Sequence, residues 1–308
     1  MDFREFWLVM RCLILGCGYV GSRFADYSVS NGWETSATSR SASKLTELAS
    51  HGVQVLEVDW LDPQSLRDLP RVDYLLISVS HSQIPGMSPE SVHCQGLQNL
   101  FAGDWPSLKR VVYLSTTGVY GSATGGAWLD ESTPTQPTRP SSVTAVAAEK
   151  WLAEHPEIPA TTLRLAGIYG PHRIPNLDRL RRGETIEIDP HSYLNLIHVD
   201  DIVGIIGQVF RQDTIDRCYC VSDGHPVTRA EYYGQLCDWM GVPAPTIQPP
   251  SESSMKSPET WVPRRGQDKR ISNRKLLSEI GWKLRYPSIR EGMKELVQEA
   301  NMRDVGST

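Results

Sequence analysis

Residues 12–21 read Cys-Leu-Ile-Leu-Gly-Cys-Gly-Tyr-Val-Gly. The stretch begins as an apolar run that is too short for a helix, and it ends in Gly-x-Gly-x-x-Gly at Gly16, Gly18 and Gly21. Apolar residues at helical spacing follow it. A strand, a tight turn and a helix in this order form the context in which the glycine pattern predicts a dinucleotide site.

Each glycine of this turn has a separate physical role. Gly16 permits the tight turn, Gly18 lets the backbone approach a pyrophosphate, and Gly21 lets the helix pack close to the strand. The first helical turn, with Tyr19 and Val20, offers free N–H groups and the positive end of the helix dipole to phosphate oxygens. The alternative interpretation is a tight strand-to-helix turn that binds no ligand.

Strands and helices alternate through the first half of the chain. This alternation predicts an α/β fold of the Rossmann type, with a doubly wound parallel sheet that binds ligands at the carboxyl ends of its strands. Further strands are expected at 33–38, 53–58, 72–79, 110–114 and 161–165, helices at 41–50, 91–101, 141–154 and 202–210, and a long loop at 121–140. Beyond residue 165 the strands become short and proline, glycine and arginine increase. We therefore expect a dinucleotide-binding domain over 1–165 and a smaller α/β substrate domain over 166–308.

Composition narrows the class of protein. The chain has 308 residues and a net charge of −5, which disfavours nucleic acid as the main partner. No apolar run is long enough to span a bilayer, and no signal peptide is evident. The six cysteines have no metal-ligand spacing and form no Cys-x-x-Cys pair, so a soluble protein of the reducing cytoplasm is expected. Met10 is a possible start of translation, because residues 1–9 carry no pattern of their own.

The end of the second expected strand bears on the choice of cofactor. A site for the 2′-hydroxyl form usually has an acidic residue about 20 positions after the glycines. Here Ser39 and Arg40 occupy this place, and Lys44 follows a turn later. A guanidinium can hold two oxygens of a 2′-phosphate, which favours NADP over NAD, although NAD is not excluded. The alternative is that Arg40 only caps a surface turn.

Four later segments complete a resemblance. They are Leu-Ser-Thr-Thr-Gly-Val-Tyr-Gly at 114–121, Leu-Arg-Leu-Ala-Gly-Ile-Tyr-Gly-Pro at 163–171, Asn-Leu-Ile-His-Val-Asp-Asp at 195–201, and Tyr-Cys-Val-Ser-Asp with Pro-Val-Thr within 219–228. With the glycine turn, the chain resembles the extended short-chain dehydrogenase/reductases of the NAD-dependent epimerase/dehydratase group, from about residue 11 to 292. The resemblance implies that 195–211 returns to the core of the first domain.

The family resemblance also implies a chemistry that this chain only partly matches. A Tyr-x-x-x-Lys dyad exchanges a proton with the substrate hydroxyl in that family, and those positions fall on Ser141 and Ala145. Neither side chain can do this near neutral pH. The hydroxyl residue that holds the substrate oxygen corresponds to Thr116. The family's usual first turn glycine corresponds to Leu15, so an atypical branch is expected.

Further roles follow from family position. Asp59 would contact the adenine edge, and Ser78, Val79 and Ser80 would line the nicotinamide ribose. Substrate contacts would come from Thr117, Tyr169 and Arg173. A sugar nucleotide is one candidate for the small polar substrate. Pairing through helices of the first domain would make a homodimer, and small residues in 141–154 are compatible with such packing.

Two classes of function remain open. The first is an NAD(P)-dependent oxidoreductase or epimerase-like enzyme whose acid or base is another residue near the nicotinamide. Candidates on suitable segments are His81, Tyr120, Tyr169, His172 and Tyr193. The alternative for the tyrosines is packing, and for the histidines exposure on loops. The second class is a catalytically impaired NAD(P)H-binding sensor or regulatory module.

An Asp-Asp pair precedes the helix expected at 202–210. His198, Asp200 and Asp201 could suggest a proton relay, but an aspartate that caps the helix N–H groups is the simpler interpretation.

Overall fold

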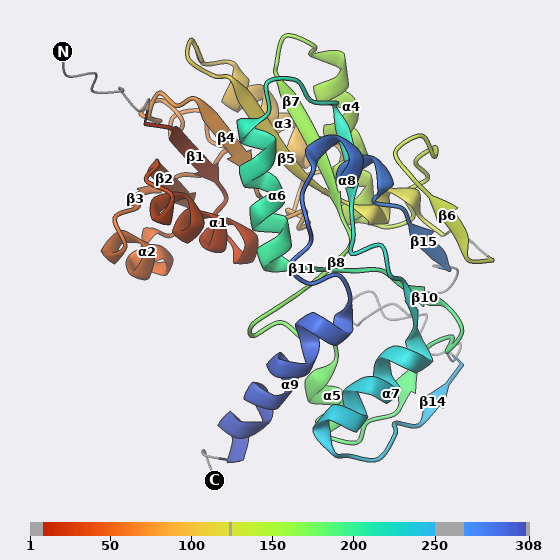
Figure 1. The fold of residues 1–308 in the computed structure, drawn as a ribbon. Coiled ribbons are helices and arrows are strands. Elements are labelled where there is room, and N and C mark those ends of the chain that lie inside the picture. Colours follow the sequence, from red (N-terminus) through yellow and green to blue (C-terminus); the bar gives the residue numbers. More distant parts are fainter. Residues whose placement is uncertain (1–8, 123–124, 250–267, 306–308) are drawn as a thin grey trace, which may run out of the picture. The chain divides into compact units, whose positions relative to one another are not determined.

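The computed structural model describes residues 9–122, 125–249 and 268–305 (Figure 1). Two compact units divide the chain. The first comprises the described residues up to Thr116, then Arg139–Leu163 and Val203–Cys218, and the second comprises Thr117–Thr138, Arg164–Ile202 and the described residues from Tyr219 onward. The expected division into 1–165 and 166–308 is simpler than this one, and it stays a prediction. Residues 1–8 of the segment before Met10 lie outside the described ranges.

Strands and helices alternate through the first half of the chain except between β3 and β4, which no helix separates. The strands are β1 (Arg11–Leu15), β2 (Glu34–Ser39), β3 (Gln54–Glu57), β4 (Tyr74–Ile77), β5 (Arg110–Thr116) and β7 (Ala160–Leu165). The helices are α1 (Tyr19–Ser30), α2 (Thr46–Ser50), α3 (Pro89–Phe101) and α4 (Pro140–Glu154), with 3-10 turns η1 (Ala42–Leu45) and η2 (Thr117–Tyr120). The helix expected over 41–50 is therefore a 3-10 turn followed by a short α-helix.

These strands and β12 (Cys218–Val221) form one seven-stranded sheet in the order β12-β7-β5-β4-β1-β2-β3. The neighbours β1 and β2, β2 and β3, β1 and β4, and β4 and β5 run parallel. From β1 the chain first builds toward β3 and then crosses back to add β4 on the other side. This reversal is the topological switch point of a doubly wound sheet, and ligands bind at the carboxyl ends of its strands.

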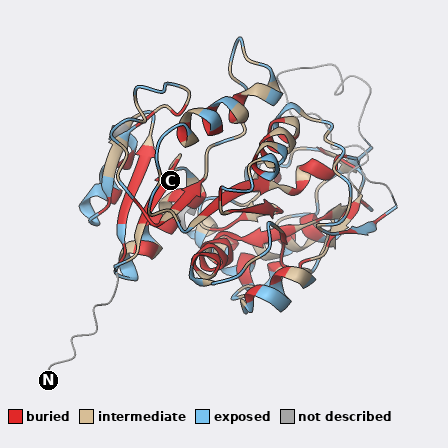
Figure 2. Cartoon of the chain, turned by 90° about the horizontal axis from the view of Figure 1, so that it is seen from above, coloured by how far each residue is buried: buried red, intermediate tan, exposed pale blue. Residues whose placement is uncertain are grey.

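Strand residues are mostly buried (Figure 2), and in the first unit apolar side chains pack on both faces of the sheet. On one face Leu13 of β1 shares a core with Ala148 of α4. On the other, the ring of Phe24 in α1 lies 5.8 Å from that of Phe210 in α6 (Val199–Arg211). Because both faces are covered, the strands carry continuous apolar runs rather than an alternating pattern.

The second unit is built from short strand pairs and helices. Its strand pairs are β8 (Gly167–Tyr169) with β11 (Leu196–His198), β10 (Tyr193–Leu194) with β13 (Val227–Thr228), β9 (Ile186–Glu187) with β14 (Ile247–Gln248), and β6 (Ala127–Leu129) with β15 (Lys269–Ile271). Its remaining helices are α5 (Leu177–Arg181), α7 (Arg229–Met240), α8 (Arg274–Ile280) and α9 (Ile289–Val305). The presence of β6 corrects the expectation of an unbroken loop over 121–140. The residues of β6 adopt a strand conformation because they pair with β15, which lies 142 positions later in the chain.

The helix expected at 202–210 begins earlier, at Val199. The expectation that its aspartate is a cap is wrong for Asp201. The carboxylate of Asp201 is fully buried and accepts hydrogen bonds from Trp282 Nε1 (3.0 Å) and from the backbone N–H groups of Arg285 (2.7 Å) and Tyr286 (2.9 Å). It therefore holds a distant segment of the second unit and not its own helix end.

Candidate cofactor site

The glycine turn is held against the end of β2. Gly16 N–H donates to Thr38 Oγ1 at 3.0 Å, and Cys17 N–H donates to the carbonyl of Thr38 at 2.7 Å. Gly16 has a φ of +81°, and a Cβ placed on it would lie 2.8 Å from Val79 Cα. Only glycine fits here without strain, because the backbone is left-handed and the segment after β4 passes against it.

The other two glycines differ in their surroundings. A Cβ on Gly21 would lie 3.1 Å from Ile14 Cγ2, so its absence lets α1 approach β1 closely. Gly18 precedes α1 as its N-cap, and no atom lies within 4 Å of a Cβ built on it. No described side chain caps this helix. An open N-cap with uncapped N–H groups is the arrangement that accepts phosphate oxygens.

A cavity of about 240 Å³ opens in the first unit at this turn. It is lined by the turn and by the segments that follow β2, β3 and β4. Eight residues predicted for the cofactor line it, namely Gly16, Gly18, Ser39, Arg40, Asp59, Ser78, Val79 and Ser80. The three others, Tyr19, Val20 and Gly21, belong to the first turn of α1, and they do not line it.

The end of β2 contributes a cationic side chain to this cavity, and Asp59 after β3 contributes an acidic one. Arg40 is exposed, and its guanidinium has no partner among the described residues. The register of β2 with β3 sets Glu57 opposite Ser39, an acidic neighbour that the linear sequence does not reveal. Arg40 lines the cavity, whereas Glu57 does not. The Asp59 carboxylate accepts a hydrogen bond from Leu61 N–H at 3.0 Å, which fixes its turn.

Cys17 is the one cysteine within the glycine turn. Burial raises the pKa of its thiol to about 11, so it stays protonated near neutral pH. A neutral thiol adds no negative charge that would repel phosphate oxygens.

The helix on which the resemblance implies the dyad positions is α4. On α4, Ser141 is exposed and Ala145 is fully buried. Lys150, further along, pairs with Glu154 at 3.8 Å on the exposed side of the helix. Thr116 ends β5 and is half-buried. Beside it, Ser115 Oγ donates to Glu149 Oε1 at 2.5 Å, which connects the strand end to α4.

His81 does not lie on an exposed loop, as the alternative interpretation held. It is half-buried after β4, and its Nε2 lies 3.0 Å from the hydroxyl of Tyr113 on β5. His93 of α3 contacts the same hydroxyl through Nδ1 at 2.9 Å. The sequence could not reveal this cluster, because its members come from three elements and share no motif.

The residues predicted for the substrate all lie in the second unit. Thr117 is buried at the start of η2. Tyr169 is fully buried in an apolar core, its hydroxyl 3.4 Å from the carbonyl of Ser288, and burial raises its pKa well above the ordinary value. Arg173 is exposed, donates from Nε to the carbonyl of Ile168 at 3.2 Å, and lines a hollow of about 290 Å³.

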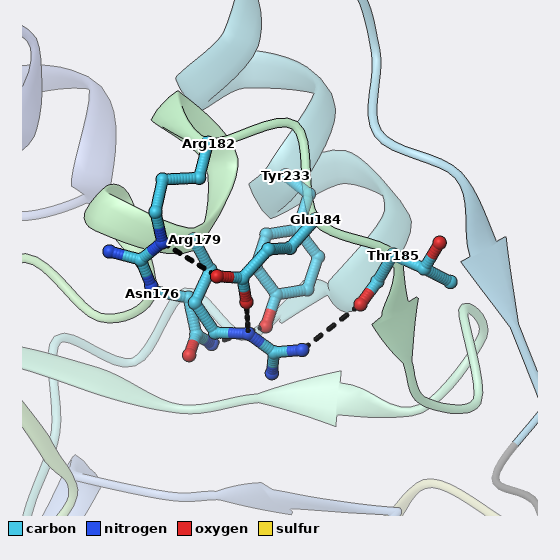
Figure 3. A network of polar contacts seen from close by, with 6 residues as sticks. All are labelled: Asn176, Arg179, Arg182, Glu184, Thr185 and Tyr233. Atoms are coloured by element: carbon cyan, nitrogen blue, oxygen red, sulfur yellow. Dashed lines mark hydrogen bonds and ion pairs between the residues drawn. The ribbon is translucent and has the colours of Figure 1, made fainter.

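Three arginines in and next to α5 form ion pairs with acidic neighbours, and Figure 3 shows two of them, Arg179 and Arg182. Arg179 Nε donates to Glu184 Oε2 at 2.9 Å, and Arg182 Nε donates to Glu184 Oε1 at 2.6 Å. Arg181 lies 3.4 Å from Asp178. These three arginines therefore form ion pairs within and next to α5. Their charges face carboxylates of the same segment and do not form a site for an external anion.

Two other kinds of site find no support. No group of three or more His, Cys, Asp or Glu in the described ranges could hold a metal ion. Among the helices described, none is long and apolar enough to cross a membrane.

The comparisons with known proteins agree with this geometry. The model of the NAD dependent epimerase/dehydratase family matches residues 12–217, and the chain belongs to that family. Protein YeeZ of Escherichia coli K12 is 26% identical over 282 residues, which cover 89% of this chain and 95% of YeeZ.

Two solved structures share the fold. The UDP-glucose 4-epimerase of Thermotoga maritima with UDP-glucose superposes with a TM-score of 0.78 at 21% identity, covering 96% of this chain and 99% of the other. The Thermus thermophilus UDP-glucose 4-epimerase in complex with NAD gives a TM-score of 0.76, also at 21% identity and with the same coverage of both chains. At this identity the likeness establishes the fold alone.

Proposed function

We propose that the chain binds a nicotinamide dinucleotide in the cavity around Gly16 and Gly18, with NADP preferred over NAD. One observation carries the proposal: an open, uncapped helix N-terminus and the partner-free guanidinium of Arg40 belong to the same cavity of the first unit. The helix end suits a pyrophosphate, and the guanidinium suits a 2′-phosphate.

Different residues around this cavity would contact different parts of the cofactor. The pyrophosphate would lie on Gly16, Gly18 and the first turn of α1 with Tyr19, Val20 and Gly21. Ser39 and Arg40 would hold the 2′-phosphate, Asp59 would contact the adenine edge, and Ser78, Val79 and Ser80 would line the nicotinamide ribose.

The proposed activity is that of an oxidoreductase or epimerase-like enzyme of the extended short-chain type on a small polar substrate, with sugar nucleotides as the first candidates. Bound nicotinamide supplies hydride transfer to such enzymes. Thr116 would hold the reacting oxygen of the substrate, and Thr117, Tyr169 and Arg173 remain the proposed substrate-side residues. Family membership and the shared fold of epimerases that bind UDP-glucose or NAD support this choice.

A second candidate is a sensor or regulatory module that binds NADP(H) without turnover. The observation in its favour is α4, where an exposed serine and a buried alanine occupy the dyad positions. A serine hydroxyl is too weak an acid to exchange a proton with substrate near neutral pH.

Cofactor binding is tested by fluorescence titration with NADPH and NADH. We expect tighter binding of NADPH, and we expect Arg40→Ala to weaken NADPH about 10- to 100-fold while leaving NADH unchanged, because charged hydrogen bonds to the phosphate are lost. Arg71→Ala is the matched control, since Arg71 is an exposed arginine of the same unit that does not line this cavity. Equal losses in the two variants would refute the 2′-phosphate role.

Gly18→Val tests the phosphate cradle separately. Its side chain would enter open space, so the fold should keep its stability while cofactor binding is lost. Binding that survives this change, or no binding of either cofactor to the unaltered protein, would refute the site.

Turnover distinguishes the enzyme from the sensor. UDP-glucose and dTDP-glucose are incubated with NADP⁺ or NAD⁺, and reduced nicotinamide and isomerised sugar are measured. Turnover that Thr116→Ala abolishes supports the enzyme. Binding without turnover, unchanged in Thr116→Ala, supports the sensor.

We further propose a homodimer located in the cytoplasm. All six cysteines are free, as expected in a reducing compartment. Sedimentation equilibrium giving the mass of one chain would refute the dimer.

A further inference from the structure

A second hollow opens in the first unit, at the amino ends of the central strands. This amino-end hollow has a volume of about 430 Å³ and shares no lining residue with the cofactor cavity, which lies at the carboxyl ends. Two segments build it. One lies within residues 63–72 and leads into β4, and the other lies within residues 99–107, where α3 ends and the chain continues toward β5.

The connection between β3 and β4 accounts for the space. A helix usually makes such a crossover between parallel strands. Here residues 60–68 form a series of turns, in which Pro63 falls and which Pro70 follows, and proline removes an N–H that a helix interior needs. Asn99 of α3 fixes the connection, because its Nδ2 donates to the carbonyls of Trp60 at 3.0 Å and Leu61 at 3.1 Å. The crossover is therefore held beside α3 without a helix of its own.

Apolar side chains form the walls of the amino-end hollow. Leu66, Leu69 and Trp105 line it, and all three pack against the core of the first unit while remaining only partly buried. The indole N–H of Trp105 donates to the carbonyl of Leu100 at 2.9 Å, which fixes the orientation of the ring. The walls are thus formed in advance, and a ligand that covers them removes apolar surface from water.

The charged side chains that line the amino-end hollow are Arg67, Arg71 and Asp104. Both guanidiniums are exposed, and within the described ranges neither forms an ion pair or a hydrogen bond, with Asp104 or with any other group. The amide of Asn99 is already used, since its Oδ1 also accepts from Gln95 Nε2 at 2.9 Å. Two cations face a single carboxylate, so the hollow favours a ligand with an anionic group.

We propose that the amino-end hollow binds a small carboxylic acid with an apolar body. The carboxylate contacts Arg67 and Arg71, and the body covers Leu66, Leu69 and Trp105. A guanidinium presents pairs of N–H groups in one plane that match a carboxylate. The volume lies within the range of small-molecule sites, about 300–1,000 Å³. The proposal does not depend on cofactor binding, because the two sites share no residue.

Binding is tested by NMR titration of the ¹⁵N-labelled full chain with hexanoate, octanoate and octanamide. The indole N–H signal of Trp105, assigned by its loss in Trp105→Phe, reports whether the hollow is occupied. Affinity should rise up to about fourfold for each added methylene, and the neutral amide should bind about tenfold more weakly than octanoate. A Trp105 signal that octanoate does not move, an affinity independent of chain length, or equal affinity for octanamide would overturn the proposal.

Charge variants test the position of the carboxylate. Arg67→Gln and Arg71→Gln should each weaken octanoate about three- to tenfold, and the double variant should bind octanoate and octanamide alike. Arg40→Gln is the matched control, since Arg40 is an exposed arginine of the same unit that lines the cofactor cavity instead. An equal loss in Arg40→Gln, or an unchanged affinity in the double variant, would overturn the proposal.

A blocking variant tests the location independently of charge. Gly103 lines the hollow, its backbone is not left-handed, and a Cβ built on it would meet its nearest atoms at 3.7 Å (Leu100 O) and 4.0 Å (Trp105 Nε1). Gly103→Leu should therefore fold and abolish octanoate binding. Gly234→Leu, in α7 of the second unit, also has room for its side chain and should bind octanoate normally. Normal binding by a folded Gly103→Leu protein would overturn the proposal; should that variant not fold, the charge variants decide.

Discussion

Two glycines of this chain share a left-handed backbone but differ in how closely other atoms approach them. Gly16 and Gly52 both have left-handed backbones, with φ of +81° and +91°. A Cβ on Gly52 would meet nothing within 4 Å, whereas one on Gly16 would meet Val79 Cα at 2.8 Å. Conformation and close approach therefore act together at Gly16, whereas at Gly52 the conformation acts alone.

The pair allows the two effects to be separated. Gly52→Ala should lower the free energy of unfolding by about 1–2 kcal/mol, which is the cost of a left-handed backbone alone. Gly16→Ala should lower the free energy of unfolding by about 1–3 kcal/mol more than Gly52→Ala does, because the backbone after β4 has to move. Urea unfolding measures both variants. Equal losses would show that the turn can relax away from Val79.

Asp223 is a buried carboxyl with an unusual titration. Its side chain is 2% exposed, Oδ1 accepts a hydrogen bond from His225 N–H, and Oδ2 has no partner within the described ranges. Burial raises its pKa to about 8, and the nearby Asp201 and Glu291 add to the effect. Because the folded pKa lies above the unfolded one, its contribution to stability is greatest below pH 4 and is lost as the pH rises to 8.

Asp223→Asn should remove this pH dependence. The free energy of unfolding of the variant, relative to the unaltered protein, should rise between pH 5 and pH 8, over a full range on the order of 5 kcal/mol from pH 4 to 8. Urea titrations at pH 5, 6.5 and 8 measure it. A difference that stays flat across these values would contradict the prediction.

Asp73 is the matched control of opposite sign. Burial acts to raise its pKa, but hydrogen bonds and charge from Arg11 and Lys109 outweigh burial and leave the pKa below its ordinary value. Its stabilisation is present above the unfolded pKa, near 4, and is lost as the pH falls through the folded pKa. Asp73→Asn should therefore destabilise the protein by a constant amount from pH 5 to 8.

At the scale of elements, helix ends show how local sequence decides structure. Helix α7 begins with a capping box, in which Thr228 Oγ1 accepts from Glu231 N–H at 3.2 Å and Glu231 Oε2 accepts from Thr228 N–H at 2.8 Å. It ends at Gly241, whose φ of 70° is left-handed. Both signals are readable from the sequence. By contrast α1 has no side-chain cap, and its N-cap residue Gly18 lines the cavity of the first unit.

Removal of the cap gives a direct test. Thr228→Ala should lower the free energy of unfolding by about 1 kcal/mol, because it leaves a helix N–H without its acceptor. Thr228→Ser keeps the hydroxyl and should stay within a few tenths of that of the unaltered protein. Thermal melting of the three proteins decides. A loss in the serine variant as large as in the alanine variant would mean that packing of the methyl group matters more than the cap.

At the scale of the whole chain, long-range polar contacts complete the second unit. Asp201, at the start of α6, accepts three hydrogen bonds from a segment more than 80 residues later. Asp201→Ala leaves three donors without their acceptor and should cost on the order of 1–3 kcal/mol for each donor that stays buried. Trypsin should then cleave faster at Lys283 and Arg285, as mass spectrometry of early fragments would show. Asp200→Ala, next to it but partly exposed, is the control. Unchanged cleavage in Asp201→Ala would contradict the anchoring role.

Much of the first unit could be predicted from sequence, because its signals are local. The glycine turn, the strand β1 and the helix α1 lie within 20 residues, and apolar runs marked the other strands of the sheet to within a few residues. Eight of the positions that line the cavity could also be predicted, since the carboxyl ends of parallel strands meet at one edge. Their role toward a cofactor stays a prediction. The resemblance supplied the family, which the family match confirms.

The sequence by itself determined that this is an α/β protein with a dinucleotide-type turn and without the Tyr-x-x-x-Lys pair, since residue identity and short spacing are enough for both. Only the tertiary structure decided that His81, Tyr113 and His93 share one hydroxyl, that Asp223 keeps an unpartnered buried oxygen, and that Asp201 binds residues 282–286. Hydrogen bonds and burial depend on distances between segments far apart in the chain. These distances exist only after the sheet and its connections have brought the segments together.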